Sequence, residues 1–154
     1  MTRLHDHIVA RTCRIADAMI RMSAQHFKER WNLRSTDLRL LNILEDAAAL
    51  SVNEISRRAL VDQAWVSRSL HALKARKLVE RRSDPSDTRL SLFKLTKQGR
   101  EILEESRPYA VWSEKVLLDG VDERHLKSLL DQVEANTQKL LVALRAFSPR
   151  GGGL

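Results

Sequence analysis

The sequence holds little cysteine, glycine or proline and no long apolar run. One cysteine in 154 residues excludes an internal disulfide framework. Five glycines and three prolines are too few for a loop-rich fold and favour long helices joined by short connections. No apolar stretch approaches the roughly 18 residues that a membrane-spanning helix needs, and the charged N-terminal residues lack the apolar core of a secretory signal. We therefore expect one cytosolic globular domain.

Positive charge is concentrated in one third of the chain. The formal net charge is +7, and residues 57–100 hold twelve of the 27 Lys and Arg residues but only four of the 20 acids. The remainder of the chain is close to neutral. Such an asymmetry is typical of a surface that binds a polyanion. The alternative is a solvated basic face without a partner.

Apolar periodicity predicts four helices in the first half of the chain. The first runs from Leu4 to about His26, and Ser35 or Thr36 caps a second over residues 37–49. A short third helix follows Ser51. Asp62 is the expected N-cap of the fourth helix, and its buried stripe is Val66, Leu70 and Leu73.

The second half changes period at residue 78. Residues 78–82 and 89–95 alternate as short strands, and the turn formers of DPSDT between them predict a β-hairpin. Leu90 and Leu92 fall on one face of the second strand, opposite to Phe93 and Leu95. Thr96 is the expected cap of a further helix, which Pro108 kinks or breaks.

The last segment, residues 122–147, carries a heptad seam, which suits a core helix within the chain as well as a helix that packs on a partner. The seam residues are Leu126, Leu130, Val133, Thr137, Leu140 and Leu144.

Residues 54–73 combine two helical segments and a tight turn, with apolar residues at offsets that let the helices pack at a steep angle. This pattern resembles the helix-turn-helix of bacterial regulators, although Leu60 stands where a glycine commonly lies in the turn. The face of the fourth helix opposite its buried stripe offers donors and acceptors that match base edges, unless it is an ordinary solvated face. Ala64, Trp65, Arg68 and His71 are expected to point outward, with Gln63 and Ser67 on the flank.

Residues 35–105 resemble the winged helix-turn-helix of the MarR family of transcriptional regulators. The matching stretches are NEIS…VSRSLHALKARKLVERR, the DPSDTR tip of the hairpin, and KLTKQGREIL directly after it. The resemblance implies a mainly helical fold with a small β-hairpin wing. It also implies helical dimerisation regions at residues 1–30 and 106–147, and we expect residues 148–154 to form a disordered tail.

The resemblance further implies how DNA is contacted. The fourth helix would enter the major groove, and Arg89 at the wing tip would reach the adjacent minor groove with Asp87 orienting its guanidinium. The alternative for this pair is a local salt bridge of little consequence. Arg81 and Arg82, at the base of the hairpin, are better placed for phosphates. Two copies in a homodimer would bind a pseudo-palindromic operator.

Family members commonly lose DNA affinity when a small aromatic acid, or a related phenolic compound or thioester, binds between the dimer helices and the DNA-binding lobe. Residues of suitable chemistry here are His7, Arg11, Arg14, Trp31 and Trp112. Arg11 interrupts an apolar stripe, which suits either an effector carboxylate or an intersubunit salt bridge.

Other chemistries have weaker signals. Cys13 lies between two arginines that would favour its thiolate, so a peroxide sensor is one alternative and a half-buried inert thiol is the other. His5 and His7 point to different sides of a helix and no Cys/His cluster completes a metal site. No phosphate-binding loop, nucleophile elbow or paired-carboxylate spacing is present in the sequence, so we expect neither an enzyme nor a cofactor.

The sequence is thus interpreted as a dimeric, effector-responsive DNA-binding transcriptional regulator, acting as a repressor. A thiol sensor that acts through Cys13 and a non-specific architectural DNA-binding protein are the two alternatives.

Overall fold

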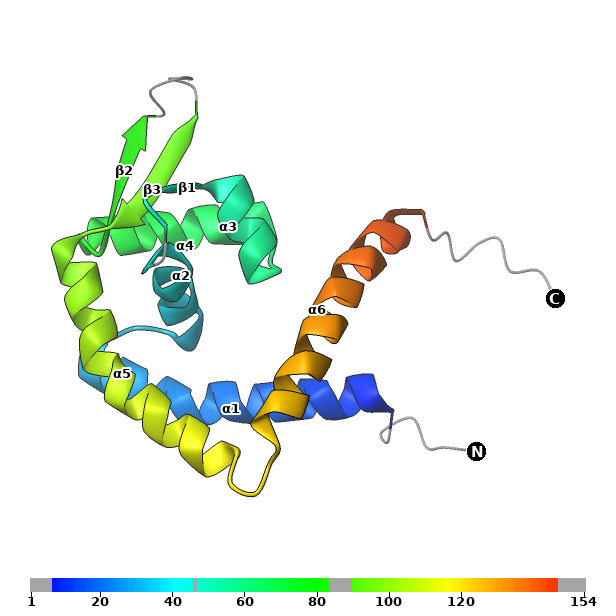
Figure 1. The fold of residues 1–154 in the computed structure, drawn as a ribbon. Helices are drawn as coiled ribbons and strands as arrows, with labels where there is room; N and C mark the ends of the chain where they lie inside the picture. Colours follow the sequence, from blue (N-terminus) through cyan, green and yellow to red (C-terminus); the bar gives the residue numbers. More distant parts are fainter. Residues whose placement is uncertain (1–6, 46, 84–89, 147–154) are drawn as a thin grey trace. The chain divides into compact units, whose positions relative to one another are not determined.

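The computed structural model describes residues 7–45, 47–83 and 90–146, which leaves Leu4, Asp87, Arg89 and the predicted tail outside the described residues. The chain divides into two compact units, Met1–Pro108 and Tyr109–Leu154. The predicted mainly helical fold with a small sheet is confirmed (Figure 1). Within the described residues, no helix has both the length and the apolar content needed to cross a bilayer. The elements in chain order are α1 (Ile8–Trp31), α2 (Ser35–Glu45), β1 (Leu50–Ser51), α3 (Val52–Ala59), α4 (Gln63–Ala75), β2 (Val79–Ser83), β3 (Ser91–Leu95), α5 (Lys97–Leu117) and α6 (Glu123–Ala146).

The core of the first unit lies between α2, α3, α4 and the sheet. Leu40 and Leu41 of α2 and Ile55 of α3 are completely buried. The predicted inner stripe of α4 is confirmed, because Val66 and Leu70 are also completely buried and Leu73 is 1% exposed. Burying one such side chain contributes about 1.5–3 kcal/mol. This shared core fixes which face of α4 is left toward solvent.

Three antiparallel strands form one sheet in the order β1-β3-β2. Val79 pairs with Leu95 and Ser83 with Ser91, so β2 and β3 form the predicted hairpin, which extends beyond the helices of this unit (Figure 1). Phe93 and Leu95 face the core, whereas Leu90 precedes the strand and is 42% exposed. The two-residue β1 was not predicted, because periodicity is undefined over two residues.

The first helix ends at Trp31, five residues later than the predicted end near His26. Asn32 takes a left-handed conformation with φ of 51°, and its N–H donates to the carbonyl of Lys28 at 2.9 Å. The N–H of Leu33 donates to the carbonyl of Phe27 at 3.2 Å. Asparagine tolerates the left-handed region better than most residues, so it ends the helix here.

The second helix corrects the prediction at both ends. It begins at Ser35 itself, so neither Ser35 nor Thr36 is its cap. The carbonyl of Arg34 accepts the N–H of Leu38 at 3.2 Å, and the carboxylate of Asp37 accepts the backbone N–H of Arg34 at 3.1 Å. An acidic side chain in the first turn therefore reaches back to the chain that enters the helix. The helix ends at Glu45 rather than at residue 49.

Thr96 caps α5 as predicted, with its hydroxyl accepting the N–H of Gly99 at 3.1 Å. Gly99 is buried, and a Cβ at this position would overlap the carbonyl oxygen of Leu78. The glycine thus allows α5 to start directly against the chain that enters the hairpin. Pro108 does not break α5, which continues to Leu117.

In the second unit, α6 leaves part of the predicted heptad seam exposed, whereas Leu126 and Thr137 are half-buried. Leu130, Val133 and Leu140 are 54%, 56% and 58% exposed. Asp122 caps the helix by accepting the N–H of His125 at 3.0 Å. The side chain of the last seam residue, Leu144, lies outside the described set.

Candidate nucleic-acid interface

Two capped helices position the candidate interface. Ser51 and Glu54 form a reciprocal capping box at the start of α3: the Ser51 hydroxyl accepts the N–H of Glu54 at 3.3 Å, and Glu54 accepts the N–H of Ser51 at 2.8 Å. The hydrogen bond from the Ser51 hydroxyl, at 2.7 Å, is the largest cause that lowers the pKa of Glu54 below its ordinary value. Asp62 caps α4 as predicted, accepting the N–H of Trp65 at 2.8 Å.

The turn between α3 and α4 is held by backbone and side-chain hydrogen bonds. Leu60 takes a left-handed conformation with φ of 55°. The N–H of Val61 donates to the carbonyl of Ser56 at 3.2 Å, and the Ser56 hydroxyl donates to the carbonyl of Val61 at 2.5 Å. Leucine therefore occupies a conformation that glycine adopts without strain. The turn keeps the geometry that a glycine would give, at some cost in stability.

The outer face of α4 carries the six residues predicted from its periodicity. Ala64, Arg68 and His71 are exposed and Ser67 is half-buried, as expected. Trp65, which was expected to point outward, is half-buried, whereas Gln63, which was expected on the flank, is exposed. Because the opposite face is buried in the core, these side chains cannot rotate inward without unfolding the lobe. The structure thus places them together, as the sequence predicted.

Two contacts on this face pre-orient polar groups. The amide nitrogen of Gln63 donates to the amide oxygen of Asn53 at 3.1 Å, across the turn from α3. The Nδ1 atom of His71 lies 2.8 Å from the carbonyl oxygen of Ser67. Sequence reasoning missed Asn53, although its place at the exposed start of α3 was a usable signal. Its contact leaves the amide oxygen of Gln63 available to a ligand.

The hairpin carries cations close to its tip. Arg81 and Arg82 were expected at the base of the hairpin, but they pair with Phe93 and Leu92, next to the last strand pair, Ser83 with Ser91. Arg81 and Arg82 are exposed. The Nε of Arg81 donates to the hydroxyl of Ser91 at 2.8 Å, while the guanidinium of Arg82 and the ammonium of Lys94 lie 2.9 and 3.0 Å from the same oxygen of Glu80. The hydrogen bond from Lys94 is the largest cause that lowers the pKa of Glu80. Glu80 therefore fixes the direction of two cations and partly neutralises them.

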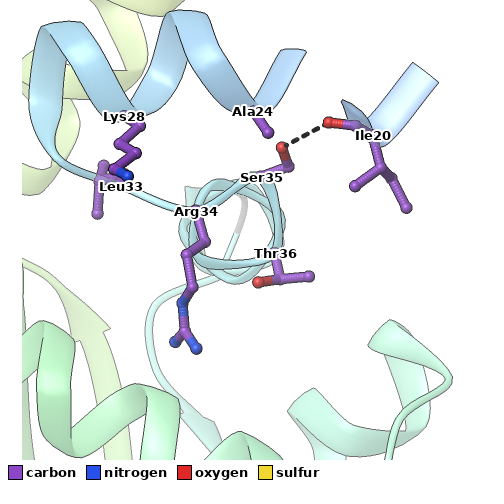
Figure 2. Close-up of a pocket in the computed structure, with 7 residues that line it drawn as sticks. All are labelled: Ile20, Ala24, Lys28, Leu33, Arg34, Ser35 and Thr36. Atoms are coloured by element: carbon purple, nitrogen blue, oxygen red, sulfur yellow. Dashed lines mark hydrogen bonds between the residues drawn. The ribbon is translucent and has the colours of Figure 1, made fainter. Parts of the chain in front are cut away.

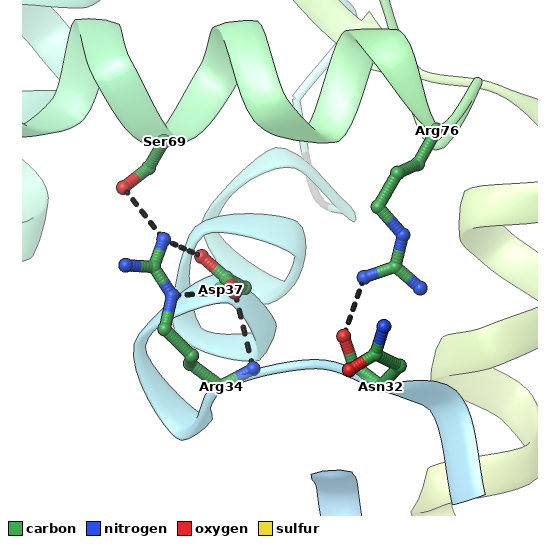
Figure 3. A network of polar contacts seen from close by, with 5 residues as sticks. All are labelled: Asn32, Arg34, Asp37, Ser69 and Arg76. Carbon is green, nitrogen blue, oxygen red and sulfur yellow. Dashed lines mark hydrogen bonds and ion pairs between the residues drawn. The ribbon is translucent and has the colours of Figure 1, made fainter.

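Two arginines join α4 to the connection between α1 and α2 (Figure 3). The guanidinium of Arg34 donates to both carboxylate oxygens of Asp37, at 2.9 and 2.7 Å, and to the hydroxyl of Ser69 on α4 at 3.4 Å. Arg76, at the end of α4, donates to the carbonyls of Asn32 at 2.7 Å and Trp31 at 2.5 Å. The side-chain hydrogen bond to Asp37 is the largest cause that raises the pKa of Arg34 above its ordinary value. Sequence reasoning assigned none of these contacts.

Comparison with known proteins identifies the fold. Residues 31–90 match the model of the MarR family. The chain is 35% identical over 109 residues to the uncharacterized HTH-type transcriptional regulator YdgJ of Bacillus subtilis, an alignment that covers 71% of this chain and 59% of that protein. A MarR/EmrR family transcriptional regulator from Acinetobacter sp. ADP1 is 25% identical over 90% of this chain and 98% of that one, with a TM-score of 0.78. The chain is therefore similar to MarR-family regulators in sequence over residues 31–90, and its fold matches that of the Acinetobacter regulator over 90% of its length.

The matching proteins are transcriptional regulators, in agreement with the expectation that this chain is not an enzyme. The chain spans 59% of the length of its Bacillus relative. A second structure with this fold is that of Bordetella bronchiseptica BpsR, a protein whose DNA binding is regulated by 6-hydroxynicotinic acid. It is 23% identical, covers 89% of this chain and 97% of that one, and has a TM-score of 0.76, which shows a shared fold.

Of the five residues proposed to bind an effector, the four that belong to the first unit do not converge there. His7, Arg11 and Arg14 are exposed at the N-terminal end of α1, and about 25 Å of helix separates Arg14 from Trp31. Trp31 is half-buried, and its indole N–H donates to Glu105 at 3.0 Å. Trp112, in the second unit, is 60% exposed. Their role stays a prediction.

A pocket of about 190 Å³ lies elsewhere in the first unit, beside the C-terminal half of α1 (Figure 2). None of the five predicted residues lines it. The hydroxyl of Ser35 donates to the carbonyl of Ile20 at 3.4 Å along its wall. The pocket is lined by Ile20, Ala24, Lys28, Leu33, Arg34, Ser35 and Thr36.

The thiol of Cys13 is exposed on α1 rather than half-buried. Exposure makes it accessible to oxidants. Arg11 and Arg14 are exposed as well and share one side of the helix, and Cys13 lies roughly 160° and roughly 100° around the helix axis from them. Within the described ranges no three metal-ligating side chains gather, and His5 lies outside them.

Proposed function

We propose that this chain is a MarR-family, sequence-specific DNA-binding repressor that reads the major groove with the outer face of α4. The observation that carries the proposal is the polar face of α4 itself. It opposes a completely buried stripe, so a rigid helix presents Arg68, Gln63 and His71 outward. A guanidinium matches the two acceptors of guanine and a glutamine amide matches adenine in the major groove.

The hairpin supplies the second contact. Arg81 and Arg82 stand exposed in the half of β2 next to the tip, where they suit phosphate oxygens. The predicted wing-tip residues Arg89 and Asp87 lie outside the described residues, and we propose that Arg89 enters the minor groove with Asp87 as its orienting partner. Replacing Arg89 by alanine is expected to weaken binding most where the flanking DNA is A·T-rich. Equal loss on G·C-rich flanks would contradict this contact.

A homodimer is the proposed binding form. Apolar side chains stay exposed in both units, such as Ile8 and Met22 on α1 and Leu130 and Val133 on α6, at 79%, 68%, 54% and 56%. Exposed apolar area of this extent is typical of an interface between proteins. A second copy that covers it would place two α4 helices about 34 Å apart, which matches successive major grooves. The operator is then pseudo-palindromic.

The test is selection of duplexes from a random pool by the full chain, followed by competition between the selected site and random DNA. We expect a pseudo-palindromic site bound at least about a thousandfold more tightly than random duplex. Sedimentation of the complex should give two chains per duplex. An architectural DNA-binding protein would show almost no preference, and a monomer or an absence of retardation at low salt would contradict the proposal.

The effector is proposed to be a small aromatic carboxylate or its thioester, which releases the DNA. The regulation of BpsR by 6-hydroxynicotinic acid, on the same fold, supports this class. Two locations are open. One is the exposed group around Arg11 and Arg14, which a second copy would have to complete. The other is the pocket beside α1, where Lys28 offers a cation while Arg34 is already paired with Asp37.

A thermal-shift screen with aromatic acids and their thioesters tests the class, since a bound effector stabilises the native state by mass action. Replacing Lys28 by alanine should abolish the shift if the pocket is used. Replacing Arg11 and Arg14 together should abolish it if the dimer surface is used. A screen in which no aromatic acid shifts the melting temperature would overturn the effector class.

Exposure of Cys13 favours one alternative, a peroxide-sensing regulator. Under this alternative, peroxide releases DNA from the wild-type chain and not from Cys13→Ser. The main proposal predicts that both chains respond alike to peroxide.

A further inference from the structure

We propose that Arg34 and Arg76 are positioning residues that fix the direction of α4 against the C-terminal end of α1. The inference rests on the proposed DNA-binding function. It adds two residues that touch no DNA and yet set how well α4 fits its site. The bond from Arg34 to Ser69 and the bond from Arg76 to Asn32 both join α4 to the same short connection, residues 32–34 (Figure 3).

Arg76 is suited to this role by its donors and its acceptors. The carbonyls of Trp31 and Asn32 belong to the last turn and cap of α1, and a helix leaves its final carbonyls without partners inside the helix. The planar guanidinium supplies two N–H groups in a fixed fork, one for each carbonyl. Its positive charge also complements the negative end of the α1 dipole. Arg76, at the end of α4, thus caps the C-terminal end of α1.

Arg34 makes the second connection, nearer the middle of α4. Asp37 is buried, with a side chain that is 9% exposed. Its two oxygens accept two charge-assisted bonds from the Arg34 guanidinium and a third from the Arg34 backbone N–H. The guanidinium also donates to the hydroxyl of Ser69 at 3.4 Å. Ser69 is 2% exposed on the inner side of α4. Ser69 and Arg76 are seven residues apart, which is about two helical turns. Two connections at this spacing restrain rotation as well as translation of α4.

The apolar core does not provide the same restraint. Val66, Leu70 and Leu73 make α4 pack, but apolar contacts are non-directional and tolerate small shifts between packed helices. Hydrogen bonds to defined carbonyl and hydroxyl oxygens do have direction. Because α1 carries the exposed apolar side chains proposed to pair with a second copy, the direction of α4 relative to α1 sets the separation of the two DNA-reading helices. A loss of these bonds should therefore reduce discrimination between sites.

The experiment compares Arg76→Ala, Arg76→Lys, Arg34→Ala and Ser69→Ala with the wild-type chain. Arg39→Ala is the matched control, since Arg39 is an exposed arginine on α2. Each chain is tested for the ratio of affinity for the selected site to affinity for random duplex, at several salt concentrations. Hydrogen exchange of the amides in residues 66–76 is measured without DNA. Melting temperature verifies that each variant is folded.

We expect Arg76→Ala to lower the site-to-random ratio roughly two- to thirtyfold, the range seen when a remote residue alters coupling. Exchange in residues 66–76 should become faster. The dependence of affinity on salt should stay unchanged, since a lost phosphate contact would reduce its log–log slope by about 0.9. Arg76→Lys should fall between alanine and wild type, because an ammonium cannot span both carbonyls in the fixed geometry of the fork. Arg34→Ala and Ser69→Ala should act in the same direction, and Arg39→Ala should match wild type.

Each contrary result would overturn a specific part of the proposal. A reduced salt slope in Arg76→Ala would make Arg76 a phosphate contact and remove the positioning role. An unchanged ratio with unchanged exchange would remove it as well. A fully active Arg76→Lys would show that charge alone suffices. If the wild-type chain selects no duplex, the proposed function fails, while the exchange measurement still decides whether the two arginines restrain α4. If Arg76→Ala does not fold, Arg76→Lys and Ser69→Ala carry the same test.

Discussion

Helices α4 and α6 carry apolar stripes of the same kind, yet only one of them is covered within the chain. On α4, Val66 and Leu70 are completely buried. On α6, Leu130, Val133 and Leu140 are more than half exposed. The difference lies in the neighbours and not in the periodicity, because α2, α3 and the sheet enclose α4.

The contrast separates two uses of one pattern. A buried stripe turns a helix into a rigid platform whose other face is fixed toward solvent, as the DNA-reading face of α4 requires. An exposed stripe gives an isolated chain little stability and instead offers area to a partner. The two helices should therefore respond very differently to the same substitution.

The largest expected effect comes from truncating the two stripes in parallel. Leu70→Ala should lower the free energy of unfolding by about 2–5 kcal/mol, because it removes a completely buried side chain and leaves a cavity. Leu130→Ala should change it by less at low protein concentration and more as concentration rises, since its proposed partner is a second copy. Urea denaturation at several protein concentrations measures both. Equal, concentration-independent losses would remove the contrast.

The glycines of the two units give the next test. Gly99→Ala should destabilise by about 1–3 kcal/mol, because the added Cβ overlaps the carbonyl oxygen of Leu78 where α5 begins. Gly120→Ala, between α5 and α6, meets no neighbour within 4 Å and pays only for its φ of 73°. We expect its loss, followed by thermal denaturation, to be the smaller. A larger loss at Gly120 would contradict the role assigned to the close approach at Gly99.

A smaller effect, of opposite sign, is expected in the turn that leads into α4. Leu60→Gly should raise the free energy of unfolding by about 0.5–1 kcal/mol, because it removes the strain of a leucine at φ of 55°. The greater flexibility of glycine in the unfolded chain offsets only part of this stabilisation. Asn32→Gly is the matched control, because asparagine already tolerates its φ of 51°. Chemical denaturation should show a gain only for Leu60→Gly. Destabilisation by Leu60→Gly would show that the partly exposed leucine packs more than it strains.

The smallest effect concerns pH. The pKa of Glu54 is lowered in the folded chain by hydrogen bonds from Ser51 and, more weakly, by Arg58 and Arg57. A carboxyl group whose folded pKa is depressed adds stability above its unfolded pKa, near 4.3, and loses it as pH falls through the lower folded value. Glu54→Gln should therefore flatten the acid side of the stability profile. Glu134→Gln, exposed on α6, should leave the profile unchanged; an equal effect of both would contradict the capping role.

The sequence predicted those parts of the fold that depend on local pattern. The stripe of α4, its Asp62 cap, the hairpin and the Thr96 cap follow from spacing and from residue types with known local roles. The end of α1 was missed because Asn32 is a weaker stop signal than glycine. The start of α2 was missed because Asp37 bonds backward to Arg34 in a way that two nearby hydroxyl residues concealed.

The site was predictable only where one helix contains it. The outer face of α4 follows from its buried stripe, although two of its six predicted residues, Trp65 and Ser67, are half-buried. The bonds of Arg34 to Ser69 and of Arg76 to Trp31 span 35 and 45 residues, and no local pattern encodes such pairs. For the same reason the pocket beside α1 was not foreseen, since segments on both sides of the bend after Trp31 line it.

The central claim is that the outer face of α4 reads base pairs. It is tested most directly by comparing Arg68→Ala with wild type on the selected site, on the site changed at each position, and on random duplex. We predict a loss of about 1–3 kcal/mol on the selected site, with relaxed preference at one base pair in each half-site and a much smaller loss on random DNA. An equal loss on all duplexes would make Arg68 a phosphate contact and contradict base reading by this helix.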